Sequence, residues 1–425
     1  MLQGWKASSS SEVTVRKHRA DHLIALYTGI IMLIGLIVIY AIGPQRANVM
    51  NSVFGYEYSD TYFIIKQAIS FALATGSFIL FAALPYKWVF RYATTLLVLG
   101  LVACLVLAVA GWAGMDSIAL TTNGATRWFV VPGFGTVQPA EFLKFGVLIY
   151  MAAFLAKRAK EGLVNDWNAT LLPALVVSGL SLVIIVIIQK DLGTGISLAA
   201  IIVSIFFIAG LNKANLLKLG AVAVILGSLF IFTSPHRIDR VATYLKGDST
   251  TTSDADSYHI QHAKIALGSG GLLGVGVGKS VQASGYLPEA INDSIFAIYG
   301  EMFGYVGSLV LIALFVALLM RILKVSEALV DLRLKFVAAG VFGWLGIHVI
   351  LNIAAMIGIF PLTGITLSLM SYGGTSMLFV TAALGLVYQF SRYTIHESRL
   401  KEAKNEGISS RRGVGRTRHS SRSGA

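Results

Sequence analysis

The chain of 425 residues is 56% hydrophobic and only 13% charged, with a mean hydropathy of +0.73, which excludes an ordinary soluble globular domain. Its net charge of +13 is also found in nucleic-acid-binding proteins, but here the Lys and Arg residues gather in alternate loops and in the tails. Membrane proteins have this distribution because positive residues are retained on the cytoplasmic side. We therefore expect a membrane protein without a nucleic-acid partner.

Apolar runs recur along most of the chain, each about 20 residues long, which is the length of a helix that crosses the hydrocarbon core. The first run starts beyond residue 20 and has no small-residue cleavage site after it, so we expect a retained helix. The pattern predicts an all-α polytopic membrane protein with about ten transmembrane helices. They are expected over residues 22–43, 62–84, 92–111, 139–156, 169–188, 194–211, 214–233, 294–320, 335–357 and 376–391.

An even number of spans places both termini on one side of the membrane. The loops on that side and the C-terminal tail carry most of the Lys and Arg residues, so this side is predicted to be the cytoplasm. The chain then divides into a cytoplasmic tail (1–21), a transmembrane domain (22–398) and a basic cytoplasmic tail (399–425) that we expect to be disordered. Residues 234–293, approximately, are expected to form a large extracytoplasmic loop between helices 7 and 8.

Ionisable residues stand at and just before the fourth predicted span. Arg127 beside Trp128 suits either an interfacial anchor or a contact with a lipid phosphate. Glu141 and Lys144 are three residues apart, so they share one helix face and can partly neutralise each other. Because ionisable residues within a span usually face a cavity or a partner, we favour a functional cavity, with a purely structural pair as the alternative.

The large loop contributes further cations, two histidines and a run of glycines. Arg240 and Lys264 are candidates to hold a pyrophosphate. His259 and His262 have the spacing of metal ligands on a helix, but no Cys and no third His lie nearby, so we expect no zinc site. The glycines over 274–280 lack the spacing of a phosphate-binding loop, and we expect them to let backbones pass closely or to let the loop bend.

Two carboxylates follow a proline just before the eighth predicted span. Pro288 stiffens the local backbone, so Glu289 and Asp293 follow a fixed bend at the membrane surface. This placement suggests chemistry, and the alternative is that Asp293 only N-caps the next helix. Glu301, roughly 12 Å further along that helix, either lines the same cavity or pairs with Lys144.

A last polar segment contains Asn352 and the stretches 358–364 and 371–376, which are broken by glycines and carry no charge. Irregular backbone at membrane depth is tolerated only where it is buried in protein or lines a cavity. We therefore expect this segment to be buried or to line a cavity.

Six motifs follow one another along the chain. They are Asn123-Gly with Arg127-Trp128, Gln138-Pro-Ala-Glu141 with Lys144, Asp191-Leu-Gly-Thr, Gly268-Ser-Gly-Gly with the later Gly-Val-Gly, Leu287-Pro-Glu-Ala with Asp293, and Pro361-Leu-Thr-Gly with Ser371-Tyr-Gly-Gly. Together they resemble the SEDS family (shape, elongation, division and sporulation), the polytopic glycosyltransferases of bacterial cell-wall synthesis. The resemblance covers nearly the whole transmembrane region. The stretch from Gly278 to Ala290 is more similar to division-type members than to elongation-type members.

The chain departs from the family pattern at several positions. Lys190 stands where the family usually has Pro, and Met302 stands where a second acid usually follows Glu301. Asp293, the acid that the resemblance implies is essential, is present. The remaining departures are His262-Ala263, Asn292, Ser294 and Leu367-Ser368.

The resemblance implies that the protein polymerises lipid II, a disaccharide-peptide on undecaprenyl pyrophosphate, into β-1,4-linked glycan strands. The reaction would take place at the outer face of the bacterial cytoplasmic membrane, at the division septum. We expect Asp293 to act as the general base or to hold a divalent cation (Mg or Mn) that assists departure of the pyrophosphate. The other candidate substrate-binding residues are Arg127, Glu141, Lys144, Arg240, Lys264, Glu289 and Glu301.

The resemblance also implies partners: a class B penicillin-binding protein that acts as a transpeptidase, division regulators, and membrane lipid. Within the family, an elongation-type polymerase is the alternative. Outside it, two other functions stay open. One is a flippase that moves a lipid-linked precursor along a path lined by Glu141, Lys144 and Glu301. The other is a division scaffold whose basic tails recruit cytosolic partners.

Overall fold

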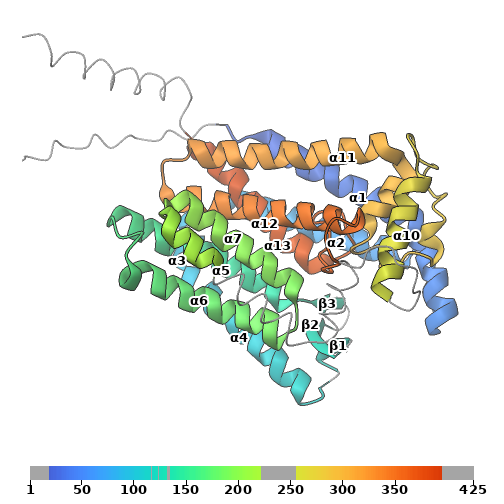
Figure 1. Cartoon of the computed structure of the whole chain (residues 1–425), viewed down its shortest axis with the longest axis horizontal. Helices are drawn as coiled ribbons and strands as arrows, with labels where there is room; N and C mark the ends of the chain where they lie inside the picture. The colour runs from blue at the N-terminus through green and yellow to red at the C-terminus, as the bar shows by residue number, and fades with distance from the viewer. Residues whose placement is uncertain (1–18, 116, 123, 132–134, 222–254, 395–425) are drawn as a thin grey trace, which may run out of the picture.

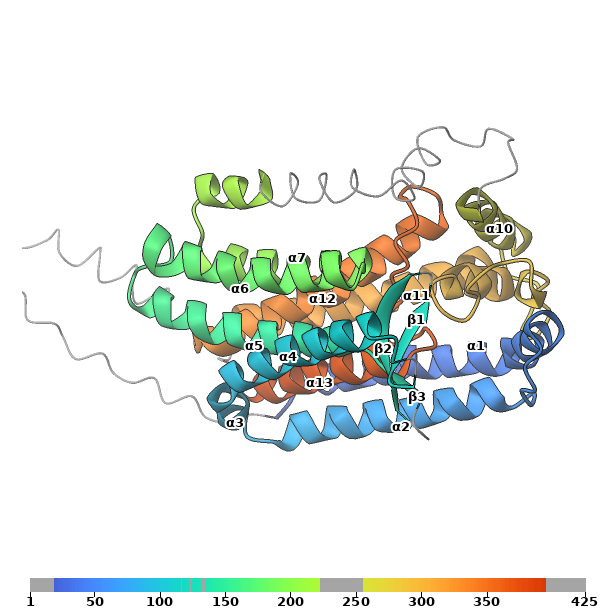
Figure 2. The same cartoon turned by 90° about the horizontal axis from the view of Figure 1, so that it is seen from below.

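The computed structural model describes residues 19–394, except 116, 123, 132–134 and 222–254. In this part of the chain long helices lie side by side, and a small sheet and a short helix lie at one end of the bundle (Figures 1 and 2). Nine helical stretches among the described residues are long and apolar enough to cross a membrane. The predicted fold class, a polytopic helical membrane protein, is confirmed.

The nine stretches match nine of the ten predicted spans. The other prediction, 214–233, lies mostly outside the described residues. α1 and α11 run well past their predicted ends at residues 43 and 320. The prediction stopped where each apolar run stops, but the polar residues that follow are still helical. The bounds are α1 (His22–Phe54), α2 (Tyr62–Ala83), α4 (Ala93–Trp112), α5 (Pro139–Lys160), the run of η1, α6 and η2 (Trp167–Ile188), α7 (Leu192–Ala209), α11 (Ile295–Ala328), α12 (Leu332–Met356) and α13 (Gly374–Phe390).

Short elements complete the description: α3 (Tyr86–Arg91), α10 (Ala255–Ser269), η3 (Gln282–Ser284) and η4 (Ser391–Tyr393). The structure also contains an antiparallel sheet that was not predicted from the sequence. Its strands pair in the order β1 (Ala119–Thr122), β2 (Ala125–Val131) and β3 (Gly135–Val137). Figure 2 shows this sheet beside the ends of α4 and α5. Arg127 is a residue of β2, the central strand of this sheet.

Helix ends follow local chemistry. Asp191 precedes α7 and accepts a hydrogen bond from the Thr194 N–H at 3.0 Å, and Asp331 precedes α12 and accepts one from the Arg333 N–H at 3.0 Å. An acidic N-cap satisfies one of the otherwise unpaired N–H groups of the first turn. α7 is followed by the capping residue Gly210, whose φ of 84° is the left-handed conformation that glycine adopts most readily.

The Asp331 cap leads to a pH-dependent prediction. Burial alone would raise the pKa of the Asp331 carboxyl, but hydrogen bonds from Arg333 and the charges of Arg333 and Lys160 outweigh it and hold that pKa below its usual range. Asp331→Asn is expected to lower the free energy of unfolding at pH 7 by up to about 1 kcal/mol, because the ion pair with Arg333 is lost while Asn can still cap the helix. Thermal unfolding of the detergent-solubilised protein measures this difference.

The sign of the pH effect follows from linkage. A carboxyl whose folded-state pKa is lowered stabilises fully above its unfolded pKa, about 4, and loses this contribution as the pH falls through the folded-state pKa. The stability difference between wild type and Asp331→Asn should therefore shrink from pH 5 towards pH 3. A difference that stays constant over that range would contradict a role for the ionised carboxylate.

The glycine-rich stretch after α10 packs against an interruption in α11. Gly304 has φ 69° and ψ −167°, so helical hydrogen bonding breaks there. The adjoining loop supplies replacement partners through backbone hydrogen bonds from Val275 to Glu301, from Gly276 to Met302, from Tyr305 to Gly271 and from Val306 to Leu272. A Cβ at Gly274 would collide with the backbone at Met302. The prediction that glycines here let two backbones pass closely is confirmed.

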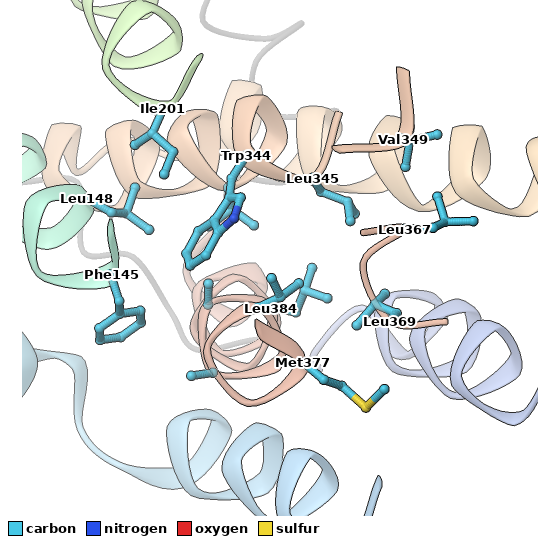
Figure 3. Packing of buried hydrophobic residues seen from close by; sticks show 14 of the residues in the cluster. Phe145, Leu148, Ile201, Trp344, Leu345, Val349, Leu367, Leu369, Met377 and Leu384 are labelled. Atoms are coloured by element: carbon cyan, nitrogen blue, oxygen red, sulfur yellow. The ribbon is translucent and has the colours of Figure 1, made fainter. Parts of the chain in front are cut away.

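The centre of the bundle consists of α5 and α12, which bury most of their side chains. Figure 3 shows Phe145 and Leu148 of α5 near Trp344 of α12, with Leu384 of α13 and Ile201 of α7 completing the packing. Peripheral helices expose large apolar side chains instead. Such faces are expected where the surrounding solvent is lipid.

The described chain starts and finishes at one end of the bundle. The Asp21 N–H donates to Ser391 Oγ at 2.8 Å, and Leu329 pairs with Thr394. We call this the terminal end. The sheet, α10 and the loops before α2, α7, α11 and α13 lie at the other end, which we call the opposite end. By the charge distribution, the terminal end is predicted to face the cytoplasm.

Candidate functional site

The opposite end is organised around the connection between α12 and α13, residues 357–373, which we call the α12–α13 connection. It follows an irregular path, with left-handed backbone at Gly364 (φ 69°). Asn352 in the last turns of α12 fixes it by donating a hydrogen bond from Nδ2 to the Ile365 carbonyl at 2.8 Å. Residues 365–371 are mostly buried. Of the residues predicted to be buried or to line a cavity, Asn352, Leu362 and Ser371 are buried, whereas the rest of 358–364 and 371–376 is half-buried or exposed, so burial is confirmed only for those three.

Asp293 lies against the α12–α13 connection, immediately before α11. Asn352 Nδ2 donates to the Asp293 carbonyl at 2.7 Å. The half-buried carboxylate points to Gly364: its Oδ2 is 3.8 Å from the position that a Cβ there would occupy. The N-cap of α11 is Ser294, whose hydroxyl donates to the Pro288 carbonyl at 2.8 Å. The alternative that Asp293 N-caps this helix is therefore wrong.

Lys264 reaches the same connection from α10. Its Nζ lies 3.2 Å from the position that a Cβ on Gly358 would occupy. Gly358 is the second residue of the connection, and Gly364, which faces Asp293, is six residues further on. The structure thus brings an ammonium and a carboxylate from two different segments to one short piece of backbone.

The two histidines of α10 make protein contacts. His259 Nε2 is hydrogen-bonded to Ser294 Oγ, and His262 Nδ1 is 2.8 Å from Gln282 Oε1. They fasten α10 to the loop that precedes α11. Over the described ranges, no group of three or more His, Cys, Asp or Glu residues is arranged to hold a metal ion.

The other predicted ligands of this end lie near the surface. The exposed Glu289 accepts a hydrogen bond from the Asn292 side chain at 2.5 Å. Arg127 on β2 donates from Nη2 to the Lys190 carbonyl at 2.6 Å, which ties the sheet to the turn before α7. Arg240 lies outside the described residues. Their substrate contacts stay predictions.

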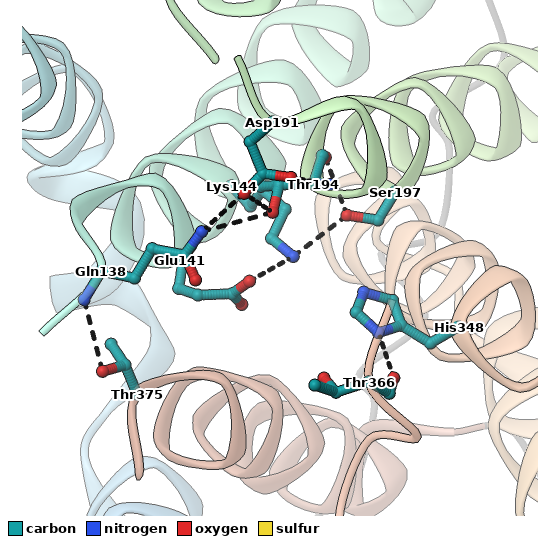
Figure 4. A network of polar contacts seen from close by, with 9 residues as sticks. All are labelled: Gln138, Glu141, Lys144, Asp191, Thr194, Ser197, His348, Thr366 and Thr375. Carbon is teal, nitrogen blue, oxygen red and sulfur yellow. Dashed lines mark hydrogen bonds and ion pairs between the residues drawn. The ribbon is translucent and has the colours of Figure 1, made fainter. Parts of the chain in front are cut away.

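Glu141 and Lys144 form a buried ion pair in the centre of the bundle (Figure 4). Lys144 Nζ is 2.7 Å from Glu141 Oε1, 3.0 Å from Ser197 Oγ and 4.8 Å from the centre of the Trp344 ring. The Lys144 side chain is fully buried. Because a single buried charge is costly, each member of this pair makes the other tolerable.

Hydrogen bonds near the ion pair join the N-terminal ends of α5, α7 and α13 (Figure 4). Gln138 Nε2 donates to Asp191 Oδ2 at 2.9 Å, and the Gln138 N–H donates to Thr375 Oγ1 at 3.3 Å. Thr194 Oγ1 donates to the same Asp191 oxygen at 2.9 Å. The polar motifs that open α5 and α7 therefore hold these helices and α13 in register at the opposite end.

Glu301 is buried on α11 and its carboxylate is engaged by a nearby turn. Its Oε1 accepts a hydrogen bond from the Val281 N–H at 3.0 Å, and Oε2 accepts one from the Ser280 hydroxyl. Lys144 pairs with Glu141 instead, so the alternative of a Glu301–Lys144 pair is wrong. A direct contact of Glu301 with substrate stays a prediction.

The sequence reading missed two residues, Trp344 and His348, which lie with Asn352 along one stripe of α12. Spacings of four residues place all three on one helix face over about 12 Å. His348 Nδ1 donates to the Thr366 carbonyl at 3.1 Å. The stripe runs from the buried ion pair, at Trp344, to the backbone of Asp293, at Asn352. The repeated spacing within an apolar span was the signal available in the sequence.

Comparison with known proteins agrees with this architecture. The family described as "Cell cycle protein" (FtsW, RodA, SpoVE) matches residues 21–396. Stage V sporulation protein E of Bacillus subtilis is 31% identical over 383 residues, covering 90% of this chain and 100% of that protein. The probable peptidoglycan glycosyltransferase FtsW of Nitrosomonas europaea is 32% identical over 387 residues, covering 89% and 94%.

A solved structure has the same fold. It is a chain of the structure described as "Structural coordination of polymerization and crosslinking by a peptidoglycan synthase complex". The TM-score is 0.66 at 22% identity, and the match covers 88% of this chain and 98% of that one. Because the family match spans nearly the whole chain and the relatives align over almost their full length, the chain belongs to the SEDS family, the FtsW/RodA/SpoVE family of cell cycle proteins.

Proposed function

We propose that this protein is a peptidoglycan glycosyltransferase that polymerises lipid II into β-1,4-linked glycan strands. The observation that carries the proposal is the placement of Asp293, whose half-buried carboxylate points at the α12–α13 connection while Asn352 holds its backbone. The names of the FtsW relatives support the reaction class.

In the proposed reaction, the 4-hydroxyl oxygen of the acceptor sugar forms a bond to the anomeric carbon of the donor. The bond from that carbon to the undecaprenyl pyrophosphate breaks, and its electron pair leaves with the pyrophosphate. Asp293 takes the hydroxyl proton as general base. The lipid pyrophosphate itself supplies the driving force, so the reaction requires no nucleotide.

Lys264 is placed to stabilise the leaving group. Its ammonium approaches the same connection as Asp293, and a fixed positive charge lowers the barrier most when it faces the charge that develops. We assign the buried Lys144–Glu141 pair a different role. Because Lys144 is fully enclosed by Glu141, Ser197 and Trp344, the pair holds α5, α7 and α12 in position.

A divalent cation is compatible with the residues present. Mg²⁺ is commonly held by one or two carboxylates and by substrate phosphates, and Asp293 is the residue that would hold it. Such an ion would neutralise charge on the pyrophosphate.

The test is a polymerisation assay with the purified full-length protein and labelled lipid II. Glycan chains resolved by electrophoresis are the expected product. A parallel assay in liposomes follows movement of the labelled lipid between leaflets. Transfer of lipid across the bilayer without any elongation would contradict the proposal and support the flippase alternative.

We further propose that the protein works at the division septum of the bacterial cytoplasmic membrane, with a class B penicillin-binding protein as its transpeptidase partner. The FtsW and sporulation relatives support the septal location. The similarity to a chain of a peptidoglycan synthase complex supports the transpeptidase partner. Addition of the purified transpeptidase should increase polymer yield in the same assay. Co-localisation of a fluorescent fusion with the septum tests the cellular site.

Asn352 is proposed as a positioning residue for Asp293. Asn352→Leu removes the hydrogen bonds to Asp293 and Ile365 and should lower kcat about 10²-fold, the effect of a roughly 1 Å displacement in an active site. The KM for lipid II should change little. Ile350→Ala on the exposed side of α12 serves as the control and should polymerise normally. Unchanged kcat in Asn352→Leu would show that this amide does not position the carboxylate.

A further inference from the structure

The terminal end of the bundle contains a cavity that the proposed reaction does not use. It has a volume of about 280 Å³ and lies between the last turns of α5 and the first turn of α12. Ala153 and Ala156 form its apolar wall, and Lys157, Lys160 and Arg333 supply three cations. An apolar wall below a cationic rim is the arrangement that an amphipathic anion requires.

The charge around this cavity is positive after neighbouring acids are counted. Arg333 is 2.7 Å from Asp331, which neutralises it in part and holds its guanidinium in place. Glu161 is committed to Arg158 at 2.9 Å. Within the described residues, no carboxylate lies within 4.0 Å of Lys157 or Lys160, which are both exposed. The charge of Lys160 also acts on Asp331, but neither lysine forms an ion pair in the described part of the chain, so both ammonium groups can still bind an anion.

The cavity lies at the level expected for lipid headgroups. Lys157 is 18 residues after Pro139, which corresponds to about 27 Å along α5 and nearly equals the thickness of the hydrocarbon core, about 30 Å. Trp88 on α3 and Trp167 after α5 are both exposed, as aromatic residues of the membrane interface are. Phe90 of α3 lies under Arg333, at 5.4 Å from ring centre to guanidinium, so α3 borders this region.

We propose that this cavity binds the phosphate group of an anionic phospholipid from the leaflet at the terminal end. Its volume is at the lower limit of small-molecule sites, about 300 Å³, so it accepts a headgroup while the acyl chains lie along the apolar helix faces. Basic pockets between transmembrane helices favour such headgroups. The segments 1–18 and 395–425 carry more Lys and Arg than Asp and Glu, so by composition an anionic lipid suits the cationic rim better than these segments do.

The test uses the full-length protein in a neutral detergent, at constant ionic strength, with three probes: dihexanoyl phosphatidylglycerol, dihexanoyl phosphatidylcholine and inorganic phosphate. Binding is followed by native mass spectrometry and by the rise in melting temperature, since a ligand that binds the folded state stabilises it. Phosphatidylglycerol should bind saturably and at least tenfold more tightly than either of the other probes. Equal binding of inorganic phosphate would overturn the lipid assignment.

Two variants locate the site. Lys157→Gln/Lys160→Gln should weaken phosphatidylglycerol binding by about tenfold or more. Lys213→Gln/Lys218→Gln removes the same charge from exposed positions that do not line the cavity, and should weaken binding less than twofold. Ala153→Leu fills the cavity without changing charge and should also reduce binding. Equal losses in the two lysine variants would reduce the effect to general surface charge and overturn the proposal, as would full binding by Ala153→Leu.

Discussion

Asp293→Asn is expected to abolish glycan polymerisation in the lipid II assay, with a loss of about 10²–10⁴-fold in rate. The amide keeps the size of the side chain and its place against Gly364, but it cannot accept the proton that leaves the acceptor hydroxyl. The hydrogen bond from Asn352 to the backbone carbonyl of residue 293 is retained in this variant, and the melting temperature, measured in parallel, separates loss of catalysis from loss of folding.

Asp60→Asn is the matched control for this prediction. Asp60 is an exposed acid in the loop between α1 and α2, at the same end of the bundle. The chemical change, from a carboxylate to an amide, is the same in both variants. Normal polymerisation by the control and none by Asp293→Asn would assign the loss to one carboxylate. Undiminished polymer from Asp293→Asn would remove this residue from the mechanism and leave the proposed reaction without a base.

The sequence predicted those features that local chemistry or membrane thickness determines. Apolar runs gave nine helices that the structure contains, because a span must match the hydrocarbon core in length. The bend after Pro288 located Asp293, since a proline limits the backbone on both sides of it. The glycines over 274–280 predicted a close approach of two backbones, and at Gly274 the loop backbone lies directly against the backbone of α11 at Met302.

Features that depend on packing between distant segments were not predictable in the same way. The Glu301 carboxylate accepts hydrogen bonds from the Val281 N–H and the Ser280 hydroxyl. These donors are within reach because the glycine-rich loop packs against α11 at the interruption at Gly304. His348 has no charged neighbour in the sequence, and its partner is the carbonyl of Thr366 in the α12–α13 connection. β1 and β3, of four and three residues, are too short to show clear alternation, and β2 ends in the apolar run over residues 128–131, which does not alternate.

Lys144→Met is expected to destabilise the protein by about 3–5 kcal/mol, the cost of leaving one member of a buried ion pair without its partner. Glu141 would lose its only ion-pair partner in the described residues while remaining almost completely buried. Ser197 would not lose its hydrogen bonding, because its hydroxyl still donates to the Thr194 carbonyl at 2.9 Å. The measurement is the free energy of unfolding in mixed micelles, taken from a denaturant titration.

A double variant separates a structural pair from a substrate contact. Glu141→Met/Lys144→Met removes both charges and keeps the side-chain volumes close to those of the pair, so most of the lost stability should return. If the pair only holds α5, α7 and α12 together, polymerisation should return with it. A double variant that is stable but inactive would contradict the positioning role, because Lys144 would then have to leave Glu141 during the reaction and meet the lipid phosphate directly.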